Sequence, residues 1–89
     1  MYYYLYEITN IINGKKYVGV HKTPLFVDDY WGSGKVIKAA IEKYGKSSFV
    51  KVILERFTNS DDMYRREREL VNEEFIARDD TYNLRIGGM

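Results

Sequence analysis

The chain has 89 residues, enough for one small domain with a single core. Hydrophobic residues make up 45% of it, which argues against disorder, and its net charge of +1 gives no overall basic field pointing to nucleic acid. There is no cysteine, so disulfides and thiolate metal sites are excluded and a reducing cytoplasm is expected. No apolar run reaches membrane-spanning length, and no signal-peptide pattern opens the chain.

Two strands joined by a tight turn are predicted at the start of the chain. Asn13-Gly14 is a strong hairpin signal, and it lies between residues 2–9 and 15–22, which have strand composition. Side chains alternate between the faces of a strand, so each strand presents one set: Tyr4, Tyr6 and Ile8 on the first, and Tyr17, Gly19 and His21 on the second. A register that puts Tyr6 and Tyr17 on the same side would create a cluster of phenols with an imidazole beside it.

The remaining elements complete an α+β domain. We expect a loop with one helical turn at residues 23–34, a helix at 35–44, a strand at 49–57, a helix at 61–77 with Ser60 as its N-cap, and a short extended tail at 81–86. The order is β-β-α-β-α, and the predicted fold is a three-stranded antiparallel sheet flanked by helices.

A glutamate interrupts the apolar stripe of the last helix. Met63, Leu70 and Val71 fall on one face, and Glu67 lies between them, four residues after Met63 and three before Leu70. Burial of an unpaired polar group costs about 2–7 kcal/mol, and more for a bare charge, unless something compensates it. A metal ion or a phenol donor would compensate the cost of burying Glu67. Pairing with an arginine, or a position at the rim of the stripe where it meets water, would also explain this residue.

These segments together resemble the GIY-YIG nuclease superfamily. The similar segments are Tyr4-Leu5-Tyr6, Tyr17-Val18-Gly19, Arg66-Glu67 followed by Leu70-Val71, and Tyr82-Asn83-Leu84 with Gly87-Gly88. The resemblance covers residues 4–88, and its nearest match is to stand-alone phage homing endonucleases, which have a similar Gly-Val-His-Lys-Thr and Gly-Ser-Gly-Lys. It implies that the chain, residues 1–89, is a nuclease catalytic domain.

The resemblance implies a divalent-metal-dependent DNA endonuclease that hydrolyses phosphodiester bonds in double-stranded DNA within the bacterial host cell. Glu67 would ligate one Mg²⁺ or Mn²⁺, a hard cation that favours carboxylate oxygen and water. Tyr6 and Tyr17 would orient or deprotonate the attacking water, and Asn83 would support the site through its amide. The near-neutral charge agrees with a separate DNA-binding module after Met89, because phosphate contacts dominate DNA affinity.

The sequence departs from the superfamily pattern in two places. Tyr4 and Leu5 stand where the superfamily has glycine and isoleucine. No arginine occurs between Tyr17 and Glu55, where many members have one that is thought to stabilise the pentavalent phosphate. Another cation must therefore serve, and Lys22 and Lys35 are candidates.

Lys35 follows Gly32-Ser33-Gly34 at a predicted helix start, where free backbone N–H groups bind phosphate, although an exposed first-turn lysine explains it equally well. His21, the only histidine, is expected to act as a general base or a phosphate contact because of its place in the strand, although a lone histidine is more often structural.

Two other interpretations stay open. A catalytically impaired DNA- or protein-binding module on the same fold would explain the missing arginine. A structural α+β domain with a tyrosine-rich core would explain the phenols, and its activity would not depend on them. Tyr30-Trp31 is expected to pack over the sheet edge rather than stack on a base. The basic patch on the last helix would contact phosphates, but pairing with acidic and polar neighbours along that helix explains it as well; its residues are Arg65, Arg66 and Arg68.

Overall fold

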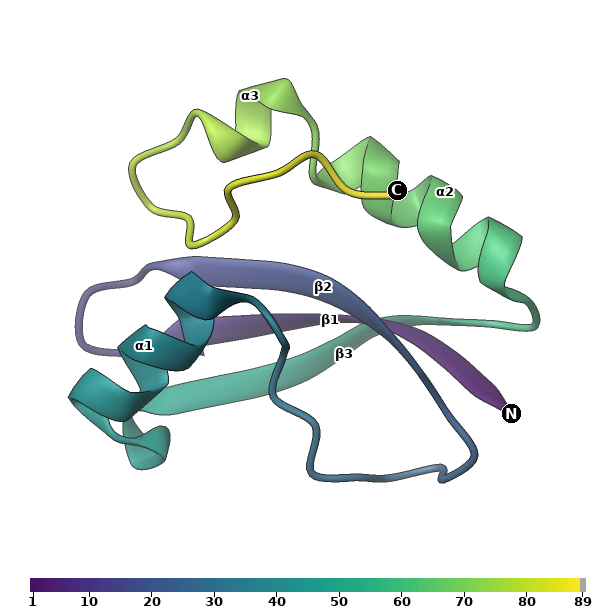
Figure 1. Cartoon of the computed structure of the whole chain (residues 1–89), viewed down its shortest axis with the longest axis horizontal. Helices are drawn as coiled ribbons and strands as arrows, with labels where there is room; N and C mark the ends of the chain where they lie inside the picture. The colour runs from purple at the N-terminus through teal and green to yellow at the C-terminus, as the bar shows by residue number, and fades with distance from the viewer. Residues whose placement is uncertain (89) are drawn as a thin grey trace.

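A three-stranded antiparallel sheet in the order β2-β1-β3 forms the centre of the molecule (Figure 1). Its strands are β1 (Tyr2–Asn10), β2 (Lys16–Thr23) and β3 (Phe49–Phe57). The computed structural model describes residues 1–88, and within them the element order is that predicted from the sequence. The α+β class and the three-stranded sheet are therefore confirmed. No helix in this part of the chain has the length and apolar character needed to cross a membrane.

The β1–β2 hairpin has the register that the tyrosine pattern required. Gly14 has a φ of 77°, a conformation that glycine adopts without strain, and the Asn13 side chain accepts a hydrogen bond from the Lys15 N–H at 2.9 Å. The paired residues on one face are Tyr4 with His21, Tyr6 with Gly19, and Ile8 with Tyr17. The hairpin thus brings the two tyrosine tripeptides together, and the Tyr6 and Tyr17 ring centroids lie 6.2 Å apart.

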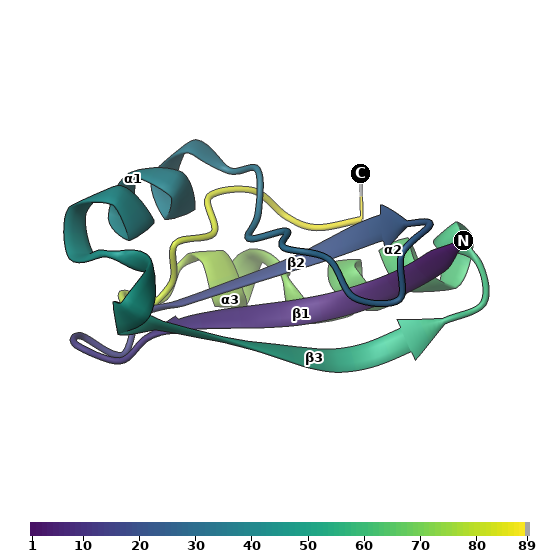
Figure 2. The same cartoon turned by 90° about the horizontal axis from the view of Figure 1, so that it is seen from below.

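The two faces of the sheet carry different cores. On the tyrosine face, Tyr4, Tyr6 and Ile8 are buried with Ile37 and Ala40 of α1 (Lys35–Tyr44), which lies near the turn end of the hairpin (Figures 1 and 2). The opposite face buries Leu5 and Val18 against Val71, with Leu70 and Phe75 packed around them. That face is covered by α2 (Ser60–Leu70) and α3 (Glu73–Ile76). β2 is an edge strand, so side chains from both sides of the sheet can meet at its free edge.

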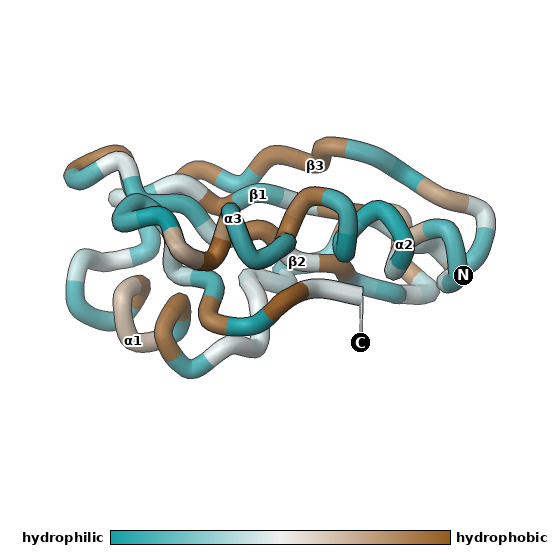
Figure 3. The backbone as a smooth tube through the Cα atoms, turned by 90° about the horizontal axis from the view of Figure 1, so that it is seen from above, coloured by the Kyte–Doolittle hydropathy of each residue, from teal (hydrophilic) through white to brown (hydrophobic). Residues whose placement is uncertain are grey.

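Strand β3 forms the other edge of the sheet, and a 3₁₀ turn (Lys46–Ser48) leads into it. Figure 3 shows several apolar stretches along this strand, and its exposed apolar side chains are Val50, Val52, Ile53 and Leu54. The pairing of β1 with β3 shifts register between Leu5 and Tyr6, which is the mark of a β-bulge. A bulge twists an edge strand and hinders its pairing with another chain.

The predicted helix at residues 61–77 is wrong in its extent. α2 ends at Leu70, and a new N-cap follows, since the Asn72 side chain accepts the Phe75 N–H at 2.9 Å and starts α3. The predicted Ser60 cap is also wrong, because Asn59 caps α2 by accepting the Asp62 N–H at 2.8 Å. Both errors have one cause: asparagine side chains compete for backbone N–H groups and set helix starts. The helical turn predicted within residues 23–34 is not found there.

Candidate active site

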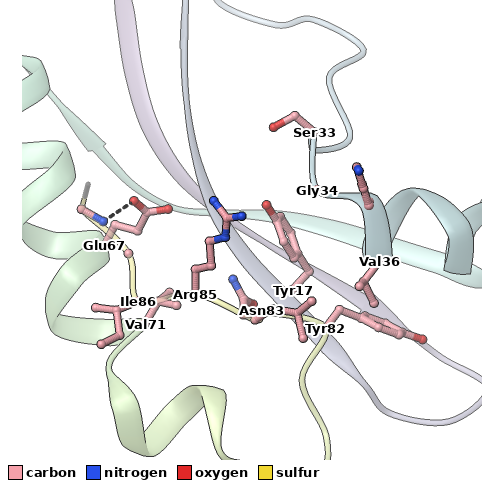
Figure 4. Close-up of a pocket in the computed structure, with 14 residues that line it drawn as sticks. Tyr17, Ser33, Gly34, Val36, Glu67, Val71, Tyr82, Asn83, Arg85 and Ile86 are labelled. Atoms are coloured by element: carbon pink, nitrogen blue, oxygen red, sulfur yellow. Dashed lines mark hydrogen bonds between the residues drawn. The ribbon is translucent and has the colours of Figure 1, made fainter.

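A cleft of about 600 Å³ opens at the free edge of β2 (Figure 4). Three segments form its walls: the start of α1, the last turns of α2, and residues 82–88, which run from β2 back to α2. Its chemically active side chains include Tyr17, Ser33, Lys35, Glu67, Asn83 and Arg85. Four of the six predicted site residues therefore line one cavity: Tyr17, Lys35, Glu67 and Asn83.

Glu67 lies on α2 where the apolar stripe opens into the cleft. Its stripe neighbours Met63 and Val71 are each 1% exposed, as the helical spacing predicted. The Gly88 N–H donates to Glu67 Oε1 at 2.7 Å, and the carboxylate forms no ion pair with another side chain among residues 1–88. Burial raises the pKa of the Glu67 carboxyl above its ordinary value, and the Gly88 hydrogen bond lowers it in part. The arginine pairing considered for Glu67 is absent from this part of the chain, so its carboxylate is available to a ligand.

Two glycines let the C-terminal segment approach α2 closely. A Cβ on Gly87 would lie 2.5 Å from Glu67 Cγ and 2.9 Å from the Glu67 carbonyl oxygen. Gly88 has a φ of +79°, and a Cβ there would lie 2.5 Å from the Tyr64 carbonyl oxygen. The Gly87 N–H donates a hydrogen bond to the Val71 carbonyl at 2.8 Å, which holds the C-terminal segment against the end of α2. The glycine pair therefore fixes the orientation of the Glu67 carboxylate.

The two tyrosines differ in their access to the cleft. Tyr17 lines it, whereas Tyr6 is 1% exposed and packs against Tyr17, with the ring centroids 6.2 Å apart. A Cβ on Gly19 would lie 2.6 Å from the Tyr6 hydroxyl oxygen, so the glycine of the second tripeptide makes room for that phenol. The structure thus places Tyr17 in the same cleft as Glu67, and it places Tyr6 behind Tyr17, outside the cleft lining.

Both phenols are protonated at neutral pH. Burial raises the pKa of Tyr17, as do the nearby Tyr30 and Glu67, and the neighbouring Tyr6 hydroxyl offsets only part of this rise. Burial, together with Tyr17 and Tyr30, raises the pKa of Tyr6 far above its ordinary value. The protein alone therefore presents Tyr17 to the cleft as a neutral hydrogen-bond donor and acceptor.

Asn83 acts through the backbone of β2. Its side-chain oxygen accepts the Val18 N–H at 2.9 Å, and its side-chain nitrogen donates to the Val18 carbonyl at 2.8 Å. The Tyr82 N–H also donates to the Lys16 carbonyl at 2.7 Å, so the segment is held to the free edge of β2. Because the oxygen and the nitrogen of the Asn83 amide both bond to the backbone of Val18, its contribution is to hold the C-terminal segment in place.

The two candidate lysines lie in different places. Lys35 is the first residue of α1 and lines the cleft. The N-cap of that helix, Gly34, provides no side-chain hydrogen bond, so the first N–H groups of α1 have no capping side chain. Lys22 is exposed and does not line the cleft.

His21 does not line the cleft. Its Nε2 lies 2.9 Å from Asp28 Oδ2, and its ring stacks on Tyr30 at a centroid distance of 3.6 Å. The Tyr4 hydroxyl donates to Asp28 Oδ1 at 3.2 Å. His21 and Tyr4 face each other across the hairpin, and the loop at residues 24–34 folds Asp28 and Tyr30 onto them. Tyr4 is thus a buried anchor of this loop.

Asp28→Asn should test this anchor through its pH dependence. Burial alone would raise the pKa of Asp28, but hydrogen bonds from Thr23, His21 and Tyr4 outweigh it and hold the pKa below its ordinary value of 3.8. The charged form therefore stabilises the fold above that pH, and this stabilisation is lost as the pH falls through the folded-state value. At neutral pH we expect the substitution to lower the free energy of unfolding by about 1–2 kcal/mol.

Urea unfolding at neutral pH and near pH 3 measures this effect. The difference between wild type and Asp28→Asn should shrink in acid, and Asp29→Asn, at an exposed position with an 82% exposed side chain, should change stability less. An equal difference at both pH values would show that the Asp28 charge is not the cause.

Arg85 and the Gly88 N–H are two polar groups of the cleft that the sequence did not reveal. Figure 4 shows the Arg85 guanidinium in the cleft, pointing into the space between Glu67 and the Tyr17 hydroxyl. The signal was its position between Asn83 and Gly87, two residues already matched to the closing segment of the superfamily.

A metal ion would have one protein carboxylate here. Within residues 1–88, no group of three or more histidine, cysteine, aspartate or glutamate side chains could hold a metal. An open cleft with a single carboxylate suits Mg²⁺, which keeps several waters and combines one or two carboxylates with substrate phosphates. The residues present fit such an ion and do not fit a closed structural site.

The fold and the cleft define an α+β domain with a carboxylate and a phenol opposed in an open, partly cationic pocket. Three proteins of Enterobacteria phage T4 are similar to this chain: it is 56% identical over 88 residues to "Putative endonuclease segD", 51% over 88 residues to "Putative endonuclease segB", and 42% over 87 residues to "Endonuclease segA". The alignments cover 99%, 99% and 98% of this chain but only 40%, 40% and 39% of those proteins. The chain thus spans about two fifths of their length. No protein-family model and no solved structure matches it.

Proposed function

We propose that the chain is the catalytic domain of a GIY-YIG type homing endonuclease, which hydrolyses phosphodiester bonds of double-stranded DNA in the cytoplasm of a phage-infected bacterium. The similarity to phage T4 proteins named endonucleases supports the activity. The observation that carries the proposal is the Glu67 carboxylate, oriented by Gly88 and facing Tyr17 across an open cleft.

Glu67 would hold one Mg²⁺ or Mn²⁺, with water and the substrate phosphate completing the coordination. Such an ion, when bound, stabilises charge on the phosphoryl oxygens and lowers the pKa of its water. Glu67 contributes a carboxylate that the Gly88 N–H holds in one orientation, at a place where burial strengthens its attraction for a cation.

The other residues would position the substrate and the attacking water. Tyr17, a neutral phenol at the cleft wall, would orient that water or a phosphate oxygen by hydrogen bonding, and Tyr6 would hold the Tyr17 hydroxyl. Lys35 would contact a phosphate from the opposite wall. His21 stays a predicted base or phosphate contact, although its bond to Asp28 favours a role in anchoring the loop.

Plasmid nicking tests the proposal. The chain should convert supercoiled plasmid to the open-circular form in Mg²⁺ or Mn²⁺, and EDTA should stop the conversion. Plasmid that stays intact with either ion at every protein concentration would contradict the proposal. It would then favour the second candidate, a binding module that has lost its chemistry, for which the absence of arginine between Tyr17 and Glu55 is the supporting observation.

DNA affinity is expected to reside largely outside these 89 residues. The net charge of +1 gives little general attraction to phosphate, and the similar phage proteins are more than twice as long as the aligned region. We expect weak binding of this chain to duplex DNA, steeply reduced by salt. Fluorescence anisotropy across a salt series measures it, and tight, salt-insensitive binding would contradict the expectation.

Gly87→Ala should impair activity through Glu67. The added methyl would lie 2.5 Å from Glu67 Cγ and 2.9 Å from the Glu67 carbonyl, so either the carboxylate or the C-terminal segment must move. A misplaced catalytic group costs roughly 10²-fold in rate. Nicking rate and thermal midpoint, measured together, should show a large loss of activity with a smaller loss of stability. A wild-type rate would show that the close contact does not position Glu67.

A further inference from the structure

Arg85 occupies the middle of the segment that closes the cleft. Asn83 binds the Val18 backbone through both of its amide groups, and two residues beyond Arg85 the Gly87 N–H donates to the Val71 carbonyl. The segment is therefore fixed to β2 on one side and to the end of α2 on the other. Arg85 lies between these two attachment points, and its guanidinium points into the cleft (Figure 4).

The Arg85 guanidinium differs from those of the other five arginines. Each of the others has a partner within residues 1–88: Arg56 lies over the Phe26 ring, Arg65 pairs with Asp62, Arg66 with Glu55 and Glu69, Arg68 with the Gly88 carbonyl, and Arg78 with Asp80. In the same residues, the Arg85 guanidinium has no hydrogen bond or ion pair. Arg56, which also lacks a hydrogen bond or ion pair there, lines a separate pocket, so within residues 1–88 Arg85 is the arginine without a partner that lines the cavity with Glu67 and Tyr17.

Charge and shape indicate which ligand these donors suit. A guanidinium offers a planar set of N–H donors that matches two oxygens of a phosphate, and such bidentate pairs are among the stronger hydrogen bonds in proteins. In phosphodiester hydrolysis, a water oxygen forms a bond to phosphorus, and the bond from phosphorus to the leaving oxygen breaks. The leaving oxygen keeps that electron pair and takes up a proton, which balances the proton that the attacking water gives up. Negative charge on the two non-bridging oxygens is greatest between these events, and a fixed cation beside them lowers the barrier.

We infer that Arg85 contacts the non-bridging oxygens of the phosphodiester in the cleft and stabilises the charge that they carry in the transition state. This inference rests on the proposed nuclease function. It supplies a cation from the C-terminal segment, in a chain that has no arginine between Tyr17 and Glu55. Glu67 and Lys35 line the same cleft, so the scissile phosphate would lie among an acid on α2, a lysine on α1 and the Arg85 guanidinium.

The kinetic test uses a small phosphodiester, bis(p-nitrophenyl) phosphate, because its hydrolysis does not depend on a DNA-binding module. With Mn²⁺ present, Arg85→Ala should lower kcat by about 100-fold and change KM by less than about threefold. Arg85→Lys should recover only part of this loss, because an ammonium lacks the bidentate fork. Arg65→Ala is the matched control: Arg65 is exposed and pairs with Asp62 in the first turns of α2, away from the cleft lining.

A binding test separates this inference from the proposed function. In EDTA, a short DNA duplex should shift the NMR resonance of Arg85 Nε and leave that of Arg65 Nε in place. If the wild type hydrolyses neither substrate but the Arg85 resonance moves, the nuclease proposal fails and the phosphate contact stands. Wild-type kcat in Arg85→Ala, or an Arg85 resonance that the duplex does not move, overturns the inference.

Discussion

Glu67→Gln should reduce phosphodiester hydrolysis by about 10³-fold or more while the domain stays folded. The amide keeps an oxygen that can accept the Gly88 N–H but loses the negative charge that would hold the divalent cation. Because burial raises the pKa of the Glu67 carboxyl, its charged form is less favourable in the folded chain than in water. Removal of the charge should therefore raise the thermal midpoint in EDTA by roughly 2–5 °C at neutral pH.

Plasmid nicking in Mg²⁺ and a thermal melt in EDTA measure the two effects. Glu69→Gln is the control, since Glu69 lies on the same helix, has a 54% exposed side chain and pairs with Arg66. It should keep activity within about threefold of the wild type, as substitutions at exposed positions away from a site usually do. Nicking by Glu67→Gln at the wild-type rate would remove Glu67 from the mechanism.

Tyr17→Phe should lower activity more than Tyr6→Phe, and Tyr6→Phe should lower stability more than Tyr17→Phe. Tyr17 presents its hydroxyl to the cleft, so its loss removes a positioned donor and should cost about 10²–10³-fold in kcat. Tyr6 acts through Tyr17, so its loss should cost about tenfold or less. Stability should follow the opposite order: the Tyr6 hydroxyl is fully buried against its phenol partners, and its loss should lower the free energy of unfolding by about 1 kcal/mol.

Steady-state kinetics and urea unfolding of the two variants check this order. A larger kinetic effect of Tyr6→Phe would mean that the buried phenol, not the cleft phenol, contacts the reacting groups. Wild-type kinetics for both variants would support the structural interpretation, in which the tyrosines only fill the core.

The features predicted well were those with local signals. Asn13-Gly14 defines a turn by its own backbone preference, and strict alternation then places Tyr4, Tyr6 and Tyr17 on one face once the register is set. The helical spacing of Met63, Glu67 and Val71 likewise showed an acid within an apolar stripe before any packing was known. Each of these conclusions depends on neighbours within a few residues.

The features missed depend on contacts between distant segments. An apolar stripe packs on the sheet that its helix covers, and this rule alone would place Glu67 on the face that carries Tyr6. α2 covers the opposite face, however, and Glu67 approaches Tyr17 only around the free edge of β2. The C-terminal segment beside Glu67 and the side chain of Arg85 are placed by bonds to β2 and α2, which no local pattern encodes.

The break at Val71 and the surroundings of His21 show a further difficulty. The apolar pattern continues from Leu70 to Phe75, so helical periodicity alone favours one helix, and the asparagine at position 72 decides otherwise through its own capping bond. The strand pattern correctly placed His21 on the tyrosine face. Its ring nitrogen contacts Asp28 rather than the cleft, however, because a loop without regular structure brings Asp28 to it.

The most direct test of the account is a crystal of the 89-residue chain soaked in Mn²⁺ and measured at the manganese absorption edge. One anomalous peak is expected in the cleft, about 2.0–2.3 Å from a Glu67 carboxylate oxygen and on the side that faces Tyr17. A crystal with Mn²⁺ bound elsewhere, or with no peak beside Glu67 at saturating metal, would contradict the assignment of this cleft as a metal-dependent active site.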